Sequence, residues 1–216
     1  MGYPILRLWE DILPDGASVA LPSLPRIIFV VHGALTIGDR SLSDGETWHG
    51  ECEVVARAGN SGVSIWRWEL TCELTSPAAR AAVSSREKLS AELRTIPDGD
   101  LALRGDSVAF PPGGCAYLHR HQGPGIRCLF EGGIRVDTHG ASTSYGPGGA
   151  WYESGPDPVF AQAASDRPSR FIRVMILPRA LLGKSSIQYV NDADRSKPRA
   201  QQYKIFADFA IARPIA

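Results

Sequence analysis

A pattern of strand, glycine turn and strand occurs twice in this chain, and this repeat limits the possible folds more than any other feature. The first copy spans residues 27–37, and the second spans residues 126–136, 99 positions later. A second pair of segments, 44–48 and 147–151, each leads from a glycine turn into a tryptophan at an offset of 103. Short strands around glycine turns, present in two copies, predict two β-sandwich or β-barrel lobes in tandem. We therefore expect an all-β fold.

One segment between the two copies departs from the β pattern. Ser76 is a candidate helix N-cap, Pro77 suits the first helical position, and residues 78–93 contain neither glycine nor proline. These features favour a short linker helix.

The chain then divides into four parts. The last of them is polar, and we expect it to form an arm that lies over a lobe or a neighbouring chain. The parts are an N-terminal lobe at 1–75, a linker at 76–97, a C-terminal lobe at 98–182 and the arm at 183–216.

The charge balance argues against two classes of partner. The chain has 23 Lys and Arg and 23 Asp and Glu, a net charge of zero, whereas nucleic-acid and anionic-membrane binders need a surplus of basic residues. No apolar run approaches the roughly 18 residues of a membrane span. The four cysteines fit no zinc or CxxC pattern, and the first residues do not have the pattern of a signal peptide. We expect a soluble cytoplasmic protein.

The segment before the second hairpin carries the residues with the most distinctive chemistry. A glycine at 113 or 114 is followed by the pair His119 and His121, and Gly132 lies in the hairpin turn. This arrangement resembles the first motif of the cupin superfamily, and residues 146–151 partly match the second motif. The resemblance covers most of both halves. It implies two cupin-type jelly-roll barrels in tandem, of which the N-terminal one is degenerate.

The chain departs from the family pattern at two positions where the family has metal ligands. The family's glutamate falls on Gly125, and its second-motif histidine falls near Val159 or Phe160. Two of the four usual ligands are therefore absent.

The two histidines remain candidate ligands. Side chains two apart on a strand point to the same face, and two neutral imidazoles can bind a divalent transition metal such as Fe, Mn, Ni or Zn. Glu153 and Gln122 are candidate replacement ligands, and Glu153 is also the candidate catalytic base. With Glu153, His119 and His121 would form a two-His-one-carboxylate set of the kind that holds non-haem Fe(II). The alternatives are a hydrogen-bonded histidine pair and a Glu153 that pairs with an arginine.

Four further side chains are candidates for the substrate pocket. Trp151 and Glu153 share a face by alternation, so both line the pocket or neither does. Tyr117 and Arg127 line it if no bulge interrupts the alternation, and otherwise lie on the surface. Phe160 is the fourth candidate.

The first copy lacks the histidine pair. At the offset of 99, His119 and His121 correspond to Ala20 and Pro22, so we expect any metal to bind in the C-terminal barrel.

The resemblance implies a small-molecule enzyme of the dioxygenase, isomerase or lyase class that uses one divalent metal. Its ligand would be an organic acid, an aromatic compound or a sugar. A non-catalytic ligand-binding or sensor protein is the alternative, and a dimerising β scaffold is a third possibility. Family analogy also suggests a homodimer.

Overall fold

The computed structural model describes residues 2–73 and 83–213, and within these ranges the protein is all-β, with only two short 3-10 helices. The chain divides into two compact units, of which the first reaches Arg94 and the second runs from Thr95 to Arg213. No helix within the described ranges has the length and apolar character needed to cross a membrane.

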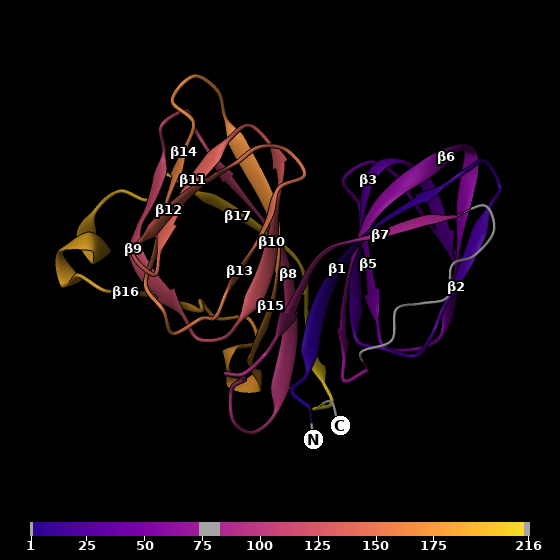
Figure 1. Ribbon diagram of the computed structural model, residues 1–216, viewed down its shortest axis with the longest axis horizontal. Helices are drawn as coiled ribbons and strands as arrows, with labels where there is room; N and C mark the ends of the chain where they lie inside the picture. The colour runs from indigo at the N-terminus through magenta and orange to yellow at the C-terminus, as the bar shows by residue number, and fades with distance from the viewer. Residues whose placement is uncertain (1, 74–82, 214–216) are drawn as a thin grey trace. The chain divides into compact units, whose positions relative to one another are not determined.

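The first unit is one antiparallel sheet of seven strands that curls round on itself (Figure 1). Its centre is β6, a long strand that pairs with β1, β2 and β3. Apolar residues of β1, β3, β5 and β6 alternate toward a common core that contains Trp48 and Ile65. The strands are β1 (Ile5–Leu13), β2 (Ser18–Leu21), β3 (Arg26–Ile37), β4 (Arg40–Leu42), β5 (Thr47–Gly50), β6 (Val54–Thr71) and β7 (Ser84–Glu92).

The predicted linker helix is wrong over residues 84–92, which form strand β7 at the edge of the first sheet. Ser76 and Pro77, the predicted helix start, lie outside the described residues. The local sequence is compatible with a helix, but β7 satisfies the otherwise unpaired backbone edge of β1. Ion pairs reinforce the pairing, because Arg86 and Lys88 both reach Glu10 on β1, at 2.7 and 3.4 Å.

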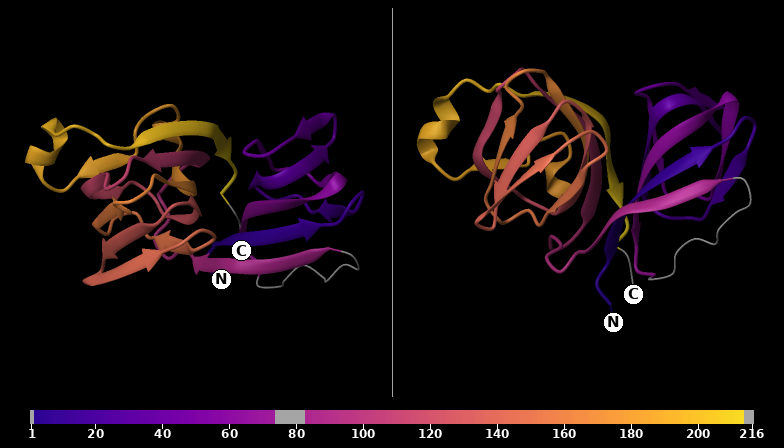
Figure 2. Two further views of the ribbon diagram at one scale, coloured as in Figure 1. Left: turned by 90° about the horizontal axis from the view of Figure 1, so that it is seen from above. Right: turned by 45° about the horizontal axis from the view of Figure 1, so that its top comes forward.

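The second unit consists of two five-stranded antiparallel sheets that face each other as a barrel (Figures 1 and 2). One sheet has the order β13-β10-β15-β8-β17, and the other has the order β12-β11-β14-β9-β16. The strands are β8 (Leu101–Phe110), β9 (Cys115–His121), β10 (Gly125–Glu131), β11 (Ile134–Thr138), β12 (Ala141–Tyr145), β13 (Ala150–Glu153), β14 (Val159–Ala163), β15 (Ser169–Pro178), β16 (Ile187–Tyr189) and β17 (Gln202–Ile211).

The segment predicted as an arm is an integral part of this second unit. Strand β16 pairs with β9 at the edge of one sheet, and β17 pairs with β8 along the edge of the other. Both strands give partners to backbone groups that would otherwise form open sheet edges. The 3-10 helices η1 (Arg179–Leu181) and η2 (Asp192–Ser196) lie in the connections before and after β16. The second unit therefore extends well beyond the predicted boundary at 182.

Strand pairing confirms the internal repeat. Ile28 of β3 pairs with Trp48 of β5, and Arg127 of β10 pairs with Trp151 of β13, at the offsets of 99 and 103 found in the sequence. The same two residues, Ile28 and Arg127, pair on their other side with Arg67 of β6 and Arg173 of β15. The two units therefore share one strand framework, and Arg67 corresponds to Arg173.

The core of the second unit lies between its two sheets. Strand β14 shows the pattern clearly, because Val159, Ala161 and Ala163 are buried while the residues between them are partly exposed. Aromatic side chains fill much of the rest: Trp151 packs edge-on against Phe171 at a ring-centroid distance of 5.2 Å.

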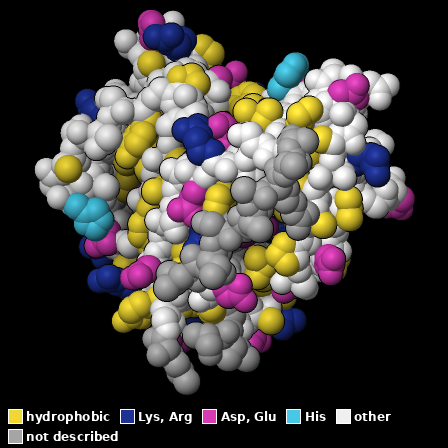
Figure 3. Space-filling view, turned by 45° about the vertical axis from the view of Figure 1, so that its right-hand side comes forward, with side chains coloured by type: hydrophobic (Ala, Val, Ile, Leu, Met, Phe, Trp, Pro, Cys, Tyr) yellow, Lys and Arg dark blue, Asp and Glu magenta, His cyan; other side chains and the backbone are white. Residues whose placement is uncertain are grey.

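Acidic and basic side chains are interspersed on the face of the molecule in Figure 3, without a broad patch of one sign. This distribution agrees with the net charge of zero.

Candidate functional site

His119 and His121 both point into the barrel of the second unit from β9. A bulge interrupts the pairing of β9 with β14, since Val159 pairs with His119 but Ala161 pairs with Ala116. Beyond the bulge the alternation is regular, and each histidine is only 5% exposed. Their Nε2 atoms lie 3.2 Å apart, and the rings meet at 82°. The predicted shared face is confirmed.

The contacts of the two imidazoles restrict where their protons can lie. His119 Nδ1 lies 2.7 Å from the carbonyl oxygen of Tyr117, which can only accept, so Nδ1 carries the proton and Nε2 of the neutral ring has a lone pair. His121 Nε2 lies 3.3 Å from Nη1 of Arg173, which can only donate. If His121 Nε2 accepts, two lone pairs face each other at 3.2 Å; if it is protonated, its hydrogen opposes the arginine N–H. No neutral arrangement satisfies both contacts.

A second proton on His119, at Nε2, would relieve this conflict, because Nε2 could then donate to His121, but the surroundings oppose it. Burial lowers the pKa of His119, against the opposing effect of Glu153. Burial also holds the pKa of His121 well below its usual value, and Arg173 and Arg127 add to the effect. Both rings are therefore held neutral, and the lone pair of His119 Nε2 faces His121 Nε2.

Arg173 is fixed by a buried ion pair with Asp106. The two residues are direct partners on β15 and β8. Nε donates to Oδ1 at 3.0 Å and Nη2 donates to Oδ2 at 2.7 Å, with both residues buried. This bidentate geometry leaves Nη1 to face His121.

A second ion pair, between Arg127 and Glu153, lies beside the histidines. Arg127 Nη2 is 2.7 Å from Glu153 Oε2, and that same oxygen is 3.6 Å from His121 Nε2. Trp151 Nε1 donates to Glu153 Oε1 at 2.9 Å. Burial lowers the pKa of Arg127 to about 10, although Glu153 opposes the shift. Among the described residues the contact between Arg127 Nη2 and Oε2 does not have hydrogen-bond geometry, so the two groups interact there as an ion pair.

The structure explains why a glycine, and not the family's glutamate, occupies position 125. A Cβ there would lie 2.4 Å from the carbonyl oxygen of Val174 and 2.8 Å from Met175 Cγ. Gly125 pairs with Glu153 of β13, and cross-strand partners project to the same face of a sheet. The carboxylate near the histidines therefore comes from the neighbouring strand. At the position of the family's second-motif histidine, Val159 is buried and is the cross-strand partner of His119.

The donor types at this site fit a divalent transition metal. Two buried imidazole nitrogens face each other, and a carboxylate oxygen lies beside one of them, which is the donor set expected for Fe, Mn, Ni or Zn. In the ranges that the structure describes, no three His, Cys, Asp or Glu side chains are gathered as a formed metal site. Glu153, the candidate third ligand, pairs with Arg127.

Two of the predicted pocket residues lie elsewhere. The bulge in β9 brings Ala116 into the core, and the ring of Tyr117 lies 4.7 Å from Lys197 Nζ. Phe160 alternates with buried neighbours on β14 and packs under Arg135 at 5.8 Å. Neither lines the cavity that contains His121, and the other two predicted pocket residues, Arg127 and Trp151, are not among its lining residues either.

The predictions for Trp151, Glu153 and Gln122 have different outcomes. Trp151 and Glu153 share the inward face, although Trp151 serves as part of the core. Gln122 follows the end of β9, where its backbone N–H donates to the Ser186 carbonyl at 3.2 Å. Its role as a ligand stays a prediction.

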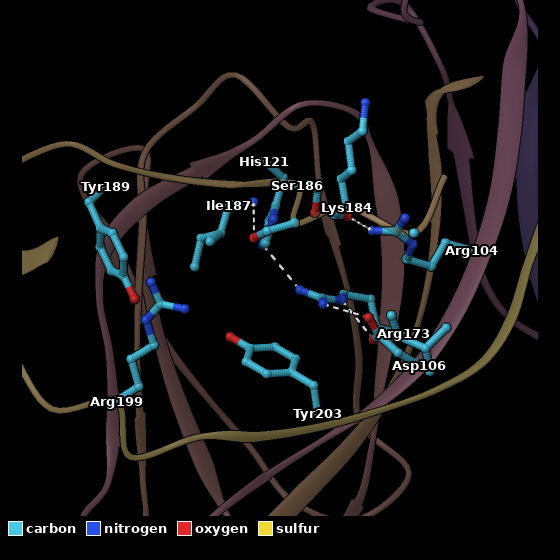
Figure 4. A pocket seen from close by; sticks show the side chains of 13 residues that line it. Arg104, Asp106, His121, Arg173, Lys184, Ser186, Ile187, Tyr189, Arg199 and Tyr203 are labelled. Carbon is cyan, nitrogen blue, oxygen red and sulfur yellow. Dashed lines mark hydrogen bonds and ion pairs between the residues drawn. The ribbon is translucent and has the colours of Figure 1, made fainter. Parts of the chain in front are cut away.

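Sequence reasoning missed Arg173 and Asp106, and with them the cavity that they line. The cavity has a volume of about 260 Å³ and extends from His121 to residues of the segment 183–205 (Figure 4). One signal was present: Arg173 interrupts the apolar run at 171–177, and a buried charge needs a partner.

The part of the first unit that corresponds to this site contains ion pairs between residues that the structure describes. Arg67 binds Asp11 through two hydrogen bonds of 2.7 and 3.1 Å, as Arg173 binds Asp106. Arg26 Nε pairs with Glu69 at 2.9 Å. Ile28 stands at the position that corresponds to Arg127.

No protein-family model matches the sequence, and neither does any curated protein. Solved structures do match. A two-residue deletion mutant of Bacillus subtilis oxalate decarboxylase has a TM-score of 0.62 at 12% identity, over 89% of this chain and 73% of that one. The formate complex of Lactobacillus farciminis oxalate decarboxylase has a TM-score of 0.64 at 12% identity, over 89% and 82%.

AerE from Microcystis aeruginosa has a TM-score of 0.57 at 13% identity, over 81% of this chain and 88% of that one. At such identities the likeness concerns the fold alone. The protein has the cupin fold that these oxalate decarboxylases share.

Proposed function

We propose that this protein is a bicupin, with a degenerate N-terminal barrel, that binds one divalent transition metal in its C-terminal barrel and acts on a small molecule there. His119 and His121 would bind the metal through their Nε2 atoms, and Glu153 would be the third ligand. The metal is one of Fe, Mn, Ni and Zn. The Mn(II) centres named for Bacillus subtilis oxalate decarboxylase, which has the same fold, support a metal in this kind of barrel.

The proton arrangement of the two imidazoles carries this proposal. Their Nε2 atoms are 3.2 Å apart, one has its tautomer fixed by Tyr117, and the other faces a guanidinium that can only donate. A cation that both nitrogens bind would remove the repulsion between their two lone pairs, and Arg173 Nη1 would then need an anionic group beside the metal as its acceptor. The Tyr117 carbonyl would also orient the ligand ring, as partners of metal-bound histidines do.

When bound, the metal would supply Lewis-acid chemistry or a site for oxygen. The side chains around it would contribute binding and orientation. Arg173 is held rigidly by Asp106, so its Nη1 is positioned to donate to an anionic group beside His121. Arg127 holds Glu153, the candidate base, next to the histidines. Dioxygenase, isomerase and lyase reactions all suit such a site.

A non-catalytic ligand-binding or sensor protein is the second candidate. The contact between Glu153 and Arg127 favours it, because a carboxylate engaged by a guanidinium at 2.7 Å is less available to a metal. Val159 opposite His119 also leaves the site without the family's fourth ligand.

Titration of metal-free protein with Co(II), followed by visible absorption and calorimetry, tests the metal site. We expect one equivalent to bind, with loss of binding in His119→Ala and His121→Ala. His32→Ala is the matched control, since His32 is an exposed residue of the first unit that pairs with Asp44. The proposal fails if the wild type binds no Co(II), or if the site variants bind as well as the control.

A further inference from the structure

The cavity beside His121 has the composition of a binding site for an organic anion. Its inner end contains His121, Arg173 and Asp106 from the barrel strands, and its outer end is formed by the segment that contains β16 and the start of β17. Figure 4 shows Arg173 and Asp106 on one side and Tyr189 with Arg199 on the other, with Tyr203 between them. With a volume of about 260 Å³, the cavity suits a small organic molecule.

The charges of the lining side chains do not balance. Arg173 is neutralised by Asp106, and Arg104 is neutralised by Asp208 at 2.8 Å and donates to carbonyl oxygens of the same segment. Two further cationic residues border the cavity, Arg199 and Lys184, and in Figure 4 the Arg199 guanidinium points into the cavity while the Lys184 ammonium points away from it. Within residues 2–73 and 83–213, no carboxylate pairs with either of them. The cavity therefore has a surplus of positive charge in a protein with a net charge of zero.

Arg199 is placed to bind an anion. Its guanidinium lies over the ring of Tyr189, 5.8 Å from the centroid, and points into the cavity (Figure 4). A planar guanidinium offers two parallel N–H groups to a carboxylate, which a lysine cannot do. The contact with Tyr189 leaves those donors directed at the cavity.

Between the two arginines the lining is aromatic and apolar. The ring of Tyr203 lies 5.9 Å from the guanidinium carbon of Arg173, and Ile187 and Ile205 complete the wall. A sugar would leave these apolar surfaces and the Arg199 guanidinium without partners, whereas an aromatic ring would cover the apolar surfaces.

We propose that this cavity binds a small aromatic carboxylate, with Arg199 as the residue that binds the carboxylate. The inference rests on the proposed function, because it identifies the class of substrate that would reach His121, but binding of the anion requires only residues of this chain. Arg199 sets specificity by charge and Tyr189 and Tyr203 set it by shape. In contrast, Arg173 lies at the inner end, beside the reaction site.

Calorimetric titration of the metal-free protein with benzoate, benzamide and acetate tests the inference. We expect saturable benzoate binding, with benzamide and acetate each at least about 10-fold weaker, because one lacks the charge and the other lacks the ring. Arg199→Gln should weaken benzoate binding by about 10- to 100-fold, and raising the salt concentration should weaken it further. Arg195→Gln, which removes an equal charge from the same segment outside the cavity, should leave it unchanged.

Equal binding of benzoate and benzamide would overturn the inference, as would an Arg199→Gln variant that binds benzoate like the wild type. Because Arg199 is exposed, its substitution should leave the unfolding temperature unchanged. The titration contains no metal, so its outcome is separate from that of the Co(II) titration. Benzoate binding without Co(II) binding would support the carboxylate cavity and refute the metal site.

Discussion

Replacing Glu153 with glutamine tests the electrostatic balance of the candidate site. The substitution keeps an oxygen acceptor for Trp151 Nε1 but removes the charge that lies 2.7 Å from Arg127. Both side chains are buried, at 1% and 11% exposure. Removing one partner of a buried ion pair costs about 3–5 kcal/mol, because the other charge remains without compensation. We therefore expect Glu153→Gln to lower the free energy of unfolding by this amount in the metal-free protein.

Urea denaturation measures this loss. With a slope of about 2 kcal/mol per molar urea, the unfolding midpoint should fall by about 2 M. Glu131→Gln is the matched control, because Glu131 pairs with Arg170 at 2.9 Å but both side chains are largely exposed, at 52% and 34%. An exposed pair contributes about 0–1 kcal/mol, so the control should change little.

A double variant separates the lost pair from other effects of the substitution. Combining Glu153→Gln with Arg127→Met removes both charges and keeps an apolar stem of similar length, so it should recover at least about 2 kcal/mol of the loss. The reasoning is refuted if Glu153→Gln costs no more than the Glu131 control, or if the double variant is no more stable than the single one.

Two further predictions concern the strands around the site and the correction to the predicted helix. Gly125→Ala should destabilise the protein by about 1–3 kcal/mol, because its Cβ would overlap the Val174 carbonyl. Gly146 has open space around it, so Gly146→Ala should not change the stability. Urea denaturation measures both variants, and equal stabilities would contradict the steric explanation. Glu10→Gln should cost about 0.5–1 kcal/mol at pH 7, because it breaks the ion pairs with Arg86 and Lys88 on β7. Burial raises the pKa of Glu10, but these partners together lower it below 4.5, so the stabilisation is present above that pH and is lost as the pH falls through the folded-state pKa. The difference in stability between wild type and Glu10→Gln should therefore shrink in unfolding measured at successively lower pH below 4.5, and a difference that does not shrink would show that the ion pairs are not its cause.

The internal repeat was the most informative part of the sequence. It predicted the all-β fold and the offsets at which Ile28 and Arg127 pair with their tryptophans. The inward direction of His119 and His121 also followed from alternation, since the bulge in β9 lies before both of them. These features depend on short-range patterns, which a single sequence contains.

Features that depend on pairing between distant segments could not be predicted in the same way. Residues 84–92 have no helix breaker, and only the open edge of β1 makes them a strand. Likewise, Arg173 and Asp106 are 67 positions apart, and their contact requires the register of β15 against β8. The one-residue bulge that turns Tyr117 away from the interior also has no clear mark in the sequence.

The most direct test of the central claim is the position of a bound cation. Crystals soaked with Mn(II) or Co(II) and measured at the metal's absorption edge would locate it by anomalous scattering. We predict one strong peak within bonding distance, about 2.0–2.2 Å, of the Nε2 atoms of both His119 and His121. The claim would be contradicted if the barrel contains no peak and the two imidazoles stay in direct contact with each other and with Arg173.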